Sequence, residues 1–461
     1  MSAYQAAYKV AQLLSRAGFE VYFIGGCVRD MLLGREPKDF DLATNASPRQ
    51  IGSLRGLESA IYKDTAQAYG VTRIKFGGHI TELATFRKDI GAHRGRKHTE
   101  VEFASLEEDL ARRDFTINAL ALDFQTNQII DFVGGLDDLE AGALLFIGPA
   151  RQRIKEDPLR ILRAIRLRND LDFAYAPETV KAIKAAVDLG RHKAIAVDRL
   201  RQELTLMIIH PSRRQALEDL DYFGLLEEFL PEVAAGKLYQ QPKQFHAEGD
   251  VWAHQLLVME ALPKRPSRQL AWAALLHDIG KTETQTLPVS ADDRIRFNRH
   301  YEVGAEMARK ILQRLRFSKS DIENICWMIY HHISIDDLPK MKPSRQHKVL
   351  SHQAFGDLFE LHRADAAASW HGRLKAKPRF GQIASLWRAY QSRPLQKRTP
   401  SLKKDLGIDG HWLAQHFPDL TAGPRFGQIL TRLQEAYLDS GRRDQDYYLR
   451  LAKKLKKEIH N

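Results

Sequence analysis

The stretch Phe23-Ile-Gly-Gly-Cys-Val-Arg-Asp-Met-Leu-Leu-Gly34 decides the fold of this chain, together with Pro37-Lys-Asp-Phe-Asp-Leu-Ala-Thr-Asn-Ala46 just after it. The apolar run 21–24 predicts a short strand, and the residues after the glycine pair predict a short helix over 28–33. A second strand is predicted around 39–43. Strands and helices that alternate this closely indicate an α/β or α+β unit.

The glycine pair and two aspartates give this unit a predicted chemistry. Gly25-Gly26 lets the backbone approach a phosphate, and N–H groups at the following helix start are ready donors. On a strand, Asp39 and Asp41 would point to the same side, where they could hold Mg²⁺ against a triphosphate. Two such ions activate an attacking hydroxyl and stabilise a leaving pyrophosphate. The alternative is an ordinary turn followed by solvated aspartates.

The wider pattern places this unit at the N-terminus of an otherwise helical chain. The first 20 residues form an amphipathic helical pattern. Further strands are predicted over 70–76, 79–86, 120–123 and 129–132. From about Ile154 onward strand signals nearly vanish and amphipathic helical patterns follow one another. The predicted fold class is therefore α+β, with a mixed-sheet head and an all-helical remainder.

The length of the chain and its proline-containing stretches suggest several domains. A chain of 461 residues can bury more than one core. Proline-containing stretches suggest boundaries. The predicted domains are a head over 1–149, a helical neck over 150–240, a third helical domain over 241–370, and a basic helical C-terminal region over 371–461.

Composition points to a polyanionic partner. Lys and Arg outnumber Asp and Glu by 70 to 58, a formal net charge of +12. Residues 371–461 carry most of that excess, which suits salt-dependent contacts with nucleic acid phosphates; ordinary solvated helix faces are the alternative. The two cysteines, Cys27 and Cys326, lie in no zinc spacing. With no signal peptide and no long apolar run, we expect a soluble, cytoplasmic protein.

The motifs of the head resemble the class II tRNA nucleotidyltransferase and bacterial poly(A) polymerase family. The resemblance includes Glu82-Leu-Ala-Thr-Phe-Arg87, Asp109-Leu-Ala-Arg-Arg-Asp-Phe-Thr-Ile-Asn-Ala119 and the hinge segment Asp131-Phe-Val-Gly-Gly-Leu-Asp-Asp-Leu139. It implies a polymerase-β-like head, with Asp39, Asp41 and Glu82 as catalytic carboxylates and Mg²⁺ on the two aspartates. The nucleotide-binding residues that it implies in the head are Gly26, Arg29, Arg113, Asp114 and Asn118. A salt-bridge cluster at a helix start is the alternative for Arg112, Arg113 and Asp114.

The neck motif Glu156-Asp-Pro-Leu-Arg-Ile-Leu-Arg-Ala-Ile-Arg-Leu-Arg168 reads as a helix start. The resemblance implies that Asp157 and Arg160 read the base, with Arg163 and Arg166 also in the nucleotide site. A carboxylate accepts from the exocyclic amine of C or A, whereas U and G offer a carbonyl there. From spacing alone, the arginines could equally form a solvated face or contact an RNA backbone.

The segment 88–98 resembles the flexible loop of enzymes that add the terminal A of tRNA. It departs from the family pattern at Arg94, where Asp is usual, and at Thr99, where Pro is usual. Leu145 stands where the family often has Arg. Addition of the terminal A is therefore the part of the expected activity that the resemblance supports least.

The third domain contains Leu275-Leu-His-Asp-Ile-Gly-Lys281, a His-Asp pair at metal-ligand spacing. The wider series of His and Asp residues resembles the HD phosphohydrolase superfamily. The implied ligands of one or two divalent ions, of unknown identity, are His254, His277, Asp278, His300, His331 and Asp365. Lys281 would stand near the phosphate as a point charge. The alternative is a helical scaffold retained for RNA binding.

The expected function is addition of C, C and A to the tRNA 3′ end from CTP and ATP without a nucleic acid template. A side activity on phosphomonoesters or 2′,3′-cyclic phosphates is expected of the HD domain. The alternatives are a poly(A) polymerase, an enzyme limited to CC or to A, and an HD phosphohydrolase whose head only recognises RNA ends. The expected partners are tRNA, ATP and CTP, with no membrane; the sequence does not predict the oligomeric state.

Overall fold

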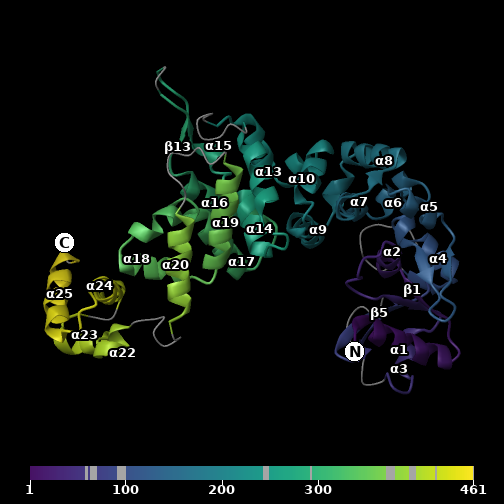
Figure 1. Ribbon diagram of the computed structural model, residues 1–461, viewed down its shortest axis with the longest axis horizontal. Helices are drawn as coiled ribbons and strands as arrows, with labels where there is room; N and C mark the ends of the chain where they lie inside the picture. The colour runs from purple at the N-terminus through teal and green to yellow at the C-terminus, as the bar shows by residue number, and fades with distance from the viewer. Residues whose placement is uncertain are drawn as a thin grey trace. The chain divides into compact units, whose positions relative to one another are not determined.

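The structure, a computed structural model, describes residues 1–57, 61–62, 70–90, 100–241, 249–290, 293–369, 379–393, 401–420 and 423–459 (Figure 1). By its internal contacts the chain divides into two compact units, Met1–Phe229 and Leu230–Asn461, and each is described by itself. The first contains the sheet and the helices that follow it, and the second is almost wholly helical.

A seven-stranded mixed sheet organises the first unit. Its strand order is β3-β4-β5-β2-β1-β8-β9, and within it only β2 and β5 run parallel. The strands are β1 (Val21–Ile24), β2 (Leu42–Thr44), β3 (Ile61–Tyr62), β4 (Val71–Phe76), β5 (His79–Thr85), β8 (Leu120–Leu122) and β9 (Ile129–Asp131). A separate antiparallel pair consists of β6 (Arg87–Ile90) and β7 (Glu100–Phe103). Strand β1 lies between β2, the central strand, and β8, so residues at its end sit inside the sheet.

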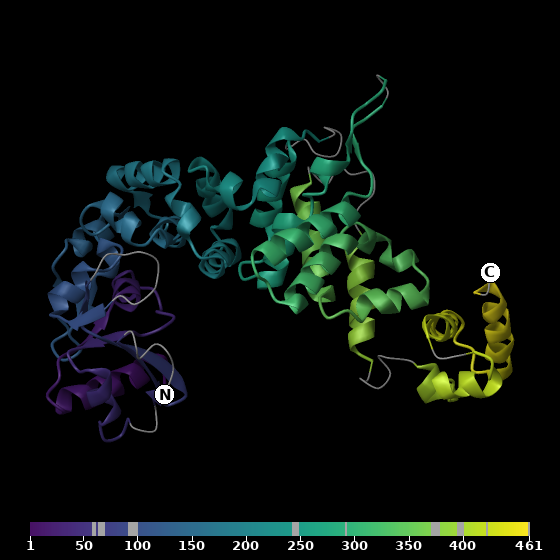
Figure 2. The ribbon, with the colours of Figure 1, turned by 180° about the vertical axis from the view of Figure 1, so that it is seen from behind.

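Helix α1 (Ala3–Arg16) covers one face of this sheet (Figure 2). Ser2 accepts from the backbone N–H of Gln5 and the Gln5 side chain accepts from the N–H of Ser2, a capping box that starts the helix. Ala7, Val10 and Leu14 recur at helical spacing and are fully buried. The amphipathic pattern of the sequence therefore becomes the packing face of α1.

Short helices then connect the sheet to a helical region within the same unit. The helices that follow α1 are α2 (Gly26–Leu32), α3 (Pro48–Gly52), α4 (Leu106–Ala111), η2 (Thr116–Asn118), α5 (Gly135–Glu140), α6 (Ala150–Glu156), α7 (Leu159–Leu171), α8 (Pro177–Asp188), η3 (Arg191–Ala194), α9 (Val197–Ile209), α10 (Arg213–Tyr222) and α11 (Leu225–Phe229). The two-residue strands β10 (Ala143–Leu144) and β11 (Ala174–Tyr175) pair in parallel. Helix α7 packs against both α9 and α10, so it forms the centre of this region.

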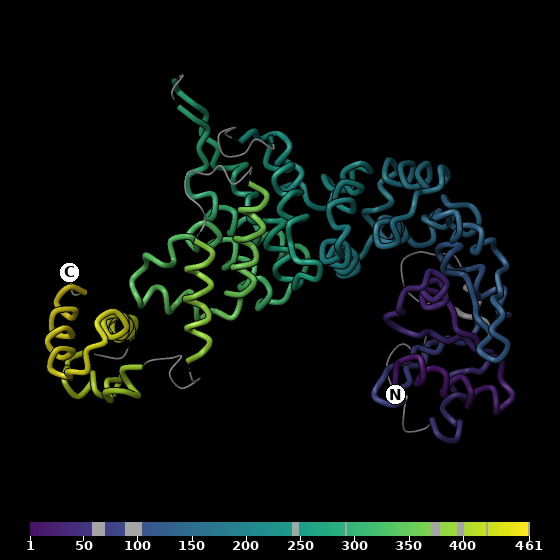
Figure 3. The backbone as a smooth tube through the Cα atoms, viewed as in Figure 1, coloured from purple at the N-terminus to yellow at the C-terminus, as the bar shows by residue number. Residues whose placement is uncertain are grey.

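The second unit is built around four helices that pack on one another, α13, α14, α17 and α19 (Figure 3). Its helices are α12 (Pro231–Ala234), η4 (Ala235–Leu238), α13 (Val251–Ala261), α14 (Arg268–Leu276), α15 (Lys281–Thr284), α16 (His300–Arg314), α17 (Lys319–His331), η5 (Ser334–Lys340), α18 (Pro343–Leu350), α19 (Phe355–Ala368), α20 (Phe380–Gln391), α22 (Leu402–Leu406), α23 (Gly410–His416), α24 (Pro424–Ser440) and α25 (Gln445–Glu458). One hairpin, β12 (Gln285–Thr286) with β13 (Arg296–Phe297), precedes α16. The last four helices share a core of their own, around Leu413, Leu433 and Tyr448.

The predicted α+β fold class is confirmed, with the mixed sheet first and helices after it. Strand β2 begins at Leu42 rather than at Asp39, so Asp39 and Asp41 precede the strand instead of lying on it. None of the described helices is long and apolar enough to cross a membrane. The cytoplasmic location stays a prediction.

Candidate functional site

The turn at Gly25 is the centre of the candidate site in the first unit. Gly25 has φ +72°, a conformation that favours glycine, and its N–H donates to the carbonyl of Leu120 on β8 at 3.0 Å. A Cβ built on Gly25 would lie 2.9 Å from Nη1 of Arg113. Any larger residue would therefore push Arg113 away from the turn. Helix α2 begins at the next residue, so its first backbone N–H groups also lie at this turn.

Three carboxylates stand beside this turn. In the parallel pairing of β2 with β5, Leu42 lies opposite Leu83, so Asp41 and Glu82 flank one another just before that pair. Burial and the charge of Glu82, opposed by Arg113, together raise the pKa of Asp41 to about 6. Asp39 adds a third negative charge and is exposed. Like charges gathered on a half-buried group favour binding of a hard cation, which suits Mg²⁺.

Asp39, Asp41 and Glu82 do not converge on one metal-binding position in this structure. Glu82 forms an ion pair with Arg73 on β4 at 2.8 Å. Among the described residues, the groups whose ligand atoms lie within 4.8 Å of one another do not include Asp39, Asp41 or Glu82. The fold places Glu82 on the interior strand β5 and the two aspartates just before the neighbouring strand β2, and a bound ion and triphosphate would have to draw them together.

Asp109 organises the two arginines of the Arg-Arg-Asp motif. It is fully buried at the end of α4 and accepts from Arg112 at 2.7 Å and from Arg113 at 3.2 Å. It also accepts from the backbone N–H of Arg87 at 3.3 Å. Arg112 and Arg113 thus pair with Asp109 at the end of α4 rather than at a helix start, and Asp109 holds Arg113 beside Gly25.

A second chain of polar contacts joins α2 to α7. Arg29 donates to Oδ1 of Asn118 at 2.6 Å, and the Asn118 amide donates to Oδ1 of Asp114 at 3.2 Å. The other oxygen of Asp114 accepts from Nε of Arg163 at 2.7 Å. Burial by itself raises the pKa of Asp114, but Arg163 and the hydrogen bonds outweigh it and hold the pKa below its usual range. Four residues assigned from sequence are thus connected to one another.

The two predicted base-reading residues differ in how exposed their side chains are. Asp157 lies between α6 and α7. Its Oδ1 accepts from the N–H of Leu159 at 3.1 Å, its Oδ2 lies 3.5 Å from Arg199, and its side chain remains 41% exposed. Arg160 is turned back toward Glu156 at 3.0 Å and toward the carbonyl of Arg153 at 2.9 Å. Asp157 is therefore partly exposed although each of its oxygens contacts a protein group, and Arg160 is oriented by protein groups.

Two further features predicted from the sequence are Arg166 and the segment 88–98. Arg166 pairs with Glu203 at 2.6 Å and with Asp170 at 3.4 Å, so it ties α7 to α9. In the segment 88–98, residues 88–90 belong to β6, and the remainder lies outside the described residues together with Arg94 and Thr99.

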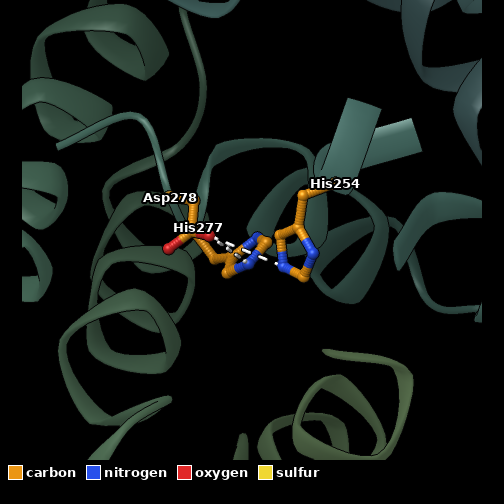
Figure 4. A group of neighbouring side chains, drawn as sticks. All are labelled: His254, His277 and Asp278. Atoms are coloured by element: carbon orange, nitrogen blue, oxygen red, sulfur yellow. Dashed lines mark ion pairs between the residues drawn. The ribbon is translucent and has the colours of Figure 1, made fainter. Parts of the chain in front are cut away.

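The second unit holds a buried cluster of histidines around Asp278 (Figure 4). His254 from α13 and His277 from the end of α14 face Oδ2 of Asp278 at 3.6 and 3.3 Å. On the other side, Nε2 of His300 and of His332 lie 3.5 and 3.7 Å from Oδ1. Each oxygen of one carboxylate thus faces its own pair of imidazoles. The two groups, which share Asp278, could each hold a divalent ion.

The tautomers of three histidines are set by the backbone. Nδ1 of His277, His300 and His332 lies 2.8, 2.8 and 2.6 Å from the carbonyl oxygen three residues earlier, so each Nδ1 must donate. Nε2 then carries a lone pair, and in all three it is buried without a hydrogen-bond partner. Burial also lowers the pKa of His300 to about 4, which keeps its ring neutral. Neutral imidazoles with a bonded Nδ1–H are the usual metal-binding form. The site therefore fits a divalent metal.

Asp365 closes the cluster, whereas His331 does not belong to it. Asp365 on α19 lies 3.0 Å from Nε2 of His254. His331 instead packs against Trp327 and lies 3.3 Å from the Ser334 hydroxyl. The structure brings His332 rather than His331 to Asp278, and we propose His332 in place of His331 as the ligand. Helical periodicity could have found this, because the buried residues Ile325, Met328 and Ile329 precede His332 by seven, four and three positions.

Lys281 reaches the cluster with the help of a residue that sequence reasoning missed. Its ammonium group lies 2.7 Å from Oδ2 of Asp278 and donates to Oε1 of Gln241 at 2.6 Å. Gln241 lies 40 residues away and in no motif, so only the tertiary structure reveals it. Lys281 is thus held by Asp278 in this structure.

Gly280 permits the close packing that assembles the cluster. A Cβ on Gly280 would lie 2.1 Å from the carbonyl oxygen of His300 and 2.5 Å from the N–H of Gly304. Both of those atoms belong to the backbone of α16, which would have to move. The glycine of the His-Asp-Ile-Gly-Lys motif is therefore required for α16 to approach Asp278.

Comparison with protein families finds three matches along the chain. Residues 21–145 match the family described as "Poly A polymerase head domain", residues 172–237 match "Probable RNA and SrmB- binding site of polymerase A", and residues 252–375 match "HD domain". The Gly25 turn and its carboxylates lie in the first match. The histidine cluster lies in the third.

Comparison with curated proteins finds similarity to CCA-adding enzymes. The chain is 30% identical over 444 residues to the CCA-adding enzyme of Streptococcus sanguinis, an alignment that covers 95% of this chain and 94% of that one. It is 40% identical over 232 residues to that of Lactobacillus helveticus, covering 50% of this chain and 56% of the relative. For several of the Lactobacillus relatives, the chain thus spans just over half of their length.

Among solved structures, the chain is similar to the Bacillus stearothermophilus CCA-adding enzyme in complex with CTP. The TM-score is 0.71 at 25% identity, and the alignment covers 100% of both chains. The likeness includes the sheet unit and the helical unit alike.

Proposed function

We propose that this chain, which belongs to the family of CCA-adding enzymes, the class II tRNA nucleotidyltransferases, adds C, C and A to the 3′ end of tRNA from CTP and ATP. The observation that carries the proposal is the pairing of two features in one unit. The Gly25 turn with its three carboxylates suits nucleotidyl transfer, and the partly exposed carboxylate of Asp157 lies on the adjoining helical region. The similarity to a relative solved with CTP supports the choice of nucleotide.

In the transfer site, Asp39 and Asp41 would hold Mg²⁺ and Glu82 would assist. The metal supplies activation of the RNA 3′-hydroxyl and charge stabilisation at the α-phosphate. The chain's own residues bind and orient the triphosphate. The N–H groups that follow Gly25, together with Gly26, Arg29 and Arg113, present donors and positive charge at that place. Pyrophosphate is the leaving group of this reaction.

Base selection would rest on Asp157 and Arg160. A carboxylate that accepts from an exocyclic amine selects C and A over U and G, and a guanidinium donates to the ring acceptor beside it. Arg160 is pre-oriented by Glu156 at 3.0 Å, which reduces the ordering cost on binding. A base amine that binds Oδ2 of Asp157 would displace Arg199, which lies 3.5 Å from that oxygen.

The partner is proposed to be tRNA, gripped in part by the basic C-terminal region. Exposed lysines and arginines of α24 and α25 are available for phosphate contacts. We keep the division into a head over 1–149, a neck over 150–240, an HD domain over 241–370 and a C-terminal region over 371–461 as a proposal.

The HD domain is proposed to be a metal-dependent phosphohydrolase of phosphomonoesters or 2′,3′-cyclic phosphates. His254, His277, Asp278 and Asp365 would hold one divalent ion, and His300 and His332 with Asp278 a second. Such ions polarise a phosphate and supply hydroxide at neutral pH. The three imidazoles with a bonded Nδ1–H and a buried, unpartnered Nε2 support this function over a purely structural one.

The experiment that tests the transfer activity uses three tRNA substrates, ending before CCA, after C and after CC. Each is incubated with the purified chain, Mg²⁺ and CTP, ATP or both. We expect CTP to extend the first two and ATP to extend the third. Failure to extend any of them would reject the proposal. Extension by C alone would instead select the CC-adding alternative, and long A tails on unrelated RNA the poly(A) polymerase.

A further inference from the structure

Lys281 is a buried cation with two hydrogen-bond acceptors. The residue is 6% exposed, and its ammonium lies 2.7 Å from Oδ2 of Asp278 and 2.6 Å from Oε1 of Gln241. The ring of Phe297 adds a weaker contact, with its centroid 5.6 Å away. A buried ammonium that keeps one acceptor of two loses little, whereas one that loses its last acceptor bears the whole cost of desolvation. The second acceptor therefore matters most when the first is withdrawn.

Asp278 gives Lys281 the same oxygen that the first metal group requires. Nε2 of His254 and of His277 lie 3.6 and 3.3 Å from Oδ2, the oxygen that the ammonium contacts (Figure 4). Lys281 would have to yield this oxygen to a divalent ion held by the two histidines, because the two positive charges repel one another. The ammonium would then depend on Gln241 for its hydrogen bond.

Gln241 is itself fixed in place. It is 3% exposed, and its amide Nε2 donates to the carbonyl of Asp250 at 3.2 Å. An ammonium only donates and a carbonyl only accepts, so these two partners set the orientation of the Gln241 amide. Asp250 in turn caps α13, the helix of His254, by accepting from the N–H of Ala253 at 2.7 Å. Oε1 of Gln241 is thus held toward Lys281 from the start of a ligand-bearing helix.

We propose that Gln241 is a positioning residue of the HD site, which holds the Lys281 ammonium when Asp278 passes to a divalent ion. Its amide is neutral, so it accepts from the ammonium without cancelling the positive charge. That charge then stays beside the metal site, where it suits an oxygen of a phosphate group. Gln241 acts through Lys281 and contacts neither metal nor phosphate. This inference rests on the proposed metal-dependent function of the HD domain.

Gln241→Met tests this role, because it keeps the length of the side chain but removes the acceptor. We expect the Kd for Mn²⁺, measured by calorimetry on the metal-free full chain, to rise at least about tenfold, the size of a hydrogen bond to a charged group. Asp278→Ala, titrated in parallel, reports the Mn²⁺ that binds elsewhere in the chain. With Mn²⁺ saturating, inorganic phosphate should also bind at least about tenfold more weakly to Gln241→Met.

Lys281→Met separates the proposed role from a structural one. Without the ammonium there is nothing for Gln241 to hold, so Lys281→Met and the double variant Gln241→Met/Lys281→Met should bind Mn²⁺ equally well. Both should bind it at least as tightly as the unmodified chain. Gln269→Met is the matched control, because the Gln269 amide donates to Asp321 at 2.7 Å in the same unit. It should leave the Mn²⁺ affinity unchanged.

Three results would overturn the inference. The first is an unchanged Mn²⁺ or phosphate affinity in Gln241→Met. The second is a weakening by Gln241→Met that persists in the Lys281→Met background, which would show that Gln241 supports the site through Asp250 and α13. The third is an equal weakening in Gln269→Met, which would show a general effect of losing an amide. An unmodified chain that binds no more Mn²⁺ than Asp278→Ala would instead reject the proposed HD function itself.

Discussion

Replacing Asp41 by Asn should stabilise the sheet unit while it abolishes nucleotide addition. Burial and the neighbouring Glu82 raise the pKa of this carboxyl from 3.8 to about 6. A folded-state pKa above the unfolded one means that the folded chain disfavours the ionised form. Below pH 3.8 the group is protonated in both states and costs nothing. The cost develops as the pH rises from about 4 to 6 and is complete above that.

A pKa difference of this size corresponds to about 3 kcal/mol at neutral pH. Asn at position 41 cannot ionise and avoids the cost. For a unit of this length, 1 kcal/mol shifts the melting temperature by about 2–4 °C. In metal-free buffer at pH 7.5 the melting temperature of the variant should therefore lie at least about 6 °C above that of the unmodified chain. At pH 4 the two should nearly coincide.

Thermal unfolding in excess EDTA, at pH 4 and at pH 7.5, measures this difference. Asp39→Asn is the matched control, because Asp39 is exposed and contributes least to the raised pKa of Asp41, so its substitution should raise the EDTA melting temperature far less. Mg²⁺ added at pH 7.5 should stabilise the unmodified chain more than Asp41→Asn, since only the former keeps the carboxylate. A variant that is no more stable than the unmodified chain at pH 7.5 would refute the reasoning about burial and charge.

Three further predictions concern the HD cluster. His332→Ala should lower the affinity for a divalent metal by about 10–100-fold, whereas His331→Ala should retain the metal. Elemental analysis after dialysis measures the bound metal, and equal losses in the two variants would return the ligand to His331. Gly280→Ala should reduce metal content and melting temperature together, because the added Cβ meets the backbone of α16 at 2.1 Å, and an unperturbed variant would contradict that packing. Asp278→Ala should abolish phosphohydrolysis and spare nucleotide addition, with Asp39→Ala doing the reverse; loss of both activities in either variant would disprove two independent sites.

The parts of the fold found from sequence are those with a local signal. The strand before Gly25 has an apolar run and a glycine stop, and α1 has a full amphipathic period, so both were predicted close to their observed bounds. Strands of two residues, such as β10 and β11, are too short to leave a pattern and were missed. The start of β2 was placed too early, because an Asp-x-Asp pattern looks the same just before a strand as on it.

The candidate sites show the same division. Adjacent residues in a motif, such as His277 and Asp278, were found together and lie together. Partners that meet only through tertiary packing were not. Gln241 at Lys281 and the engagement of Asp114 by Arg163 depend on segments 40 and 49 residues apart. The choice between His331 and His332 turned on a single step of helical phase, which the motif order leaves open.

The measurement that tests the central claim most directly is the sequence of the product ends. A tRNA that ends before CCA is incubated with the purified chain, Mg²⁺ and all four nucleotides at equal concentration, and the 3′ ends are sequenced. We predict ends that read CCA and stop there, with U and G absent. Ends that carry U or G, that extend into A tails, or that show no addition would contradict the account.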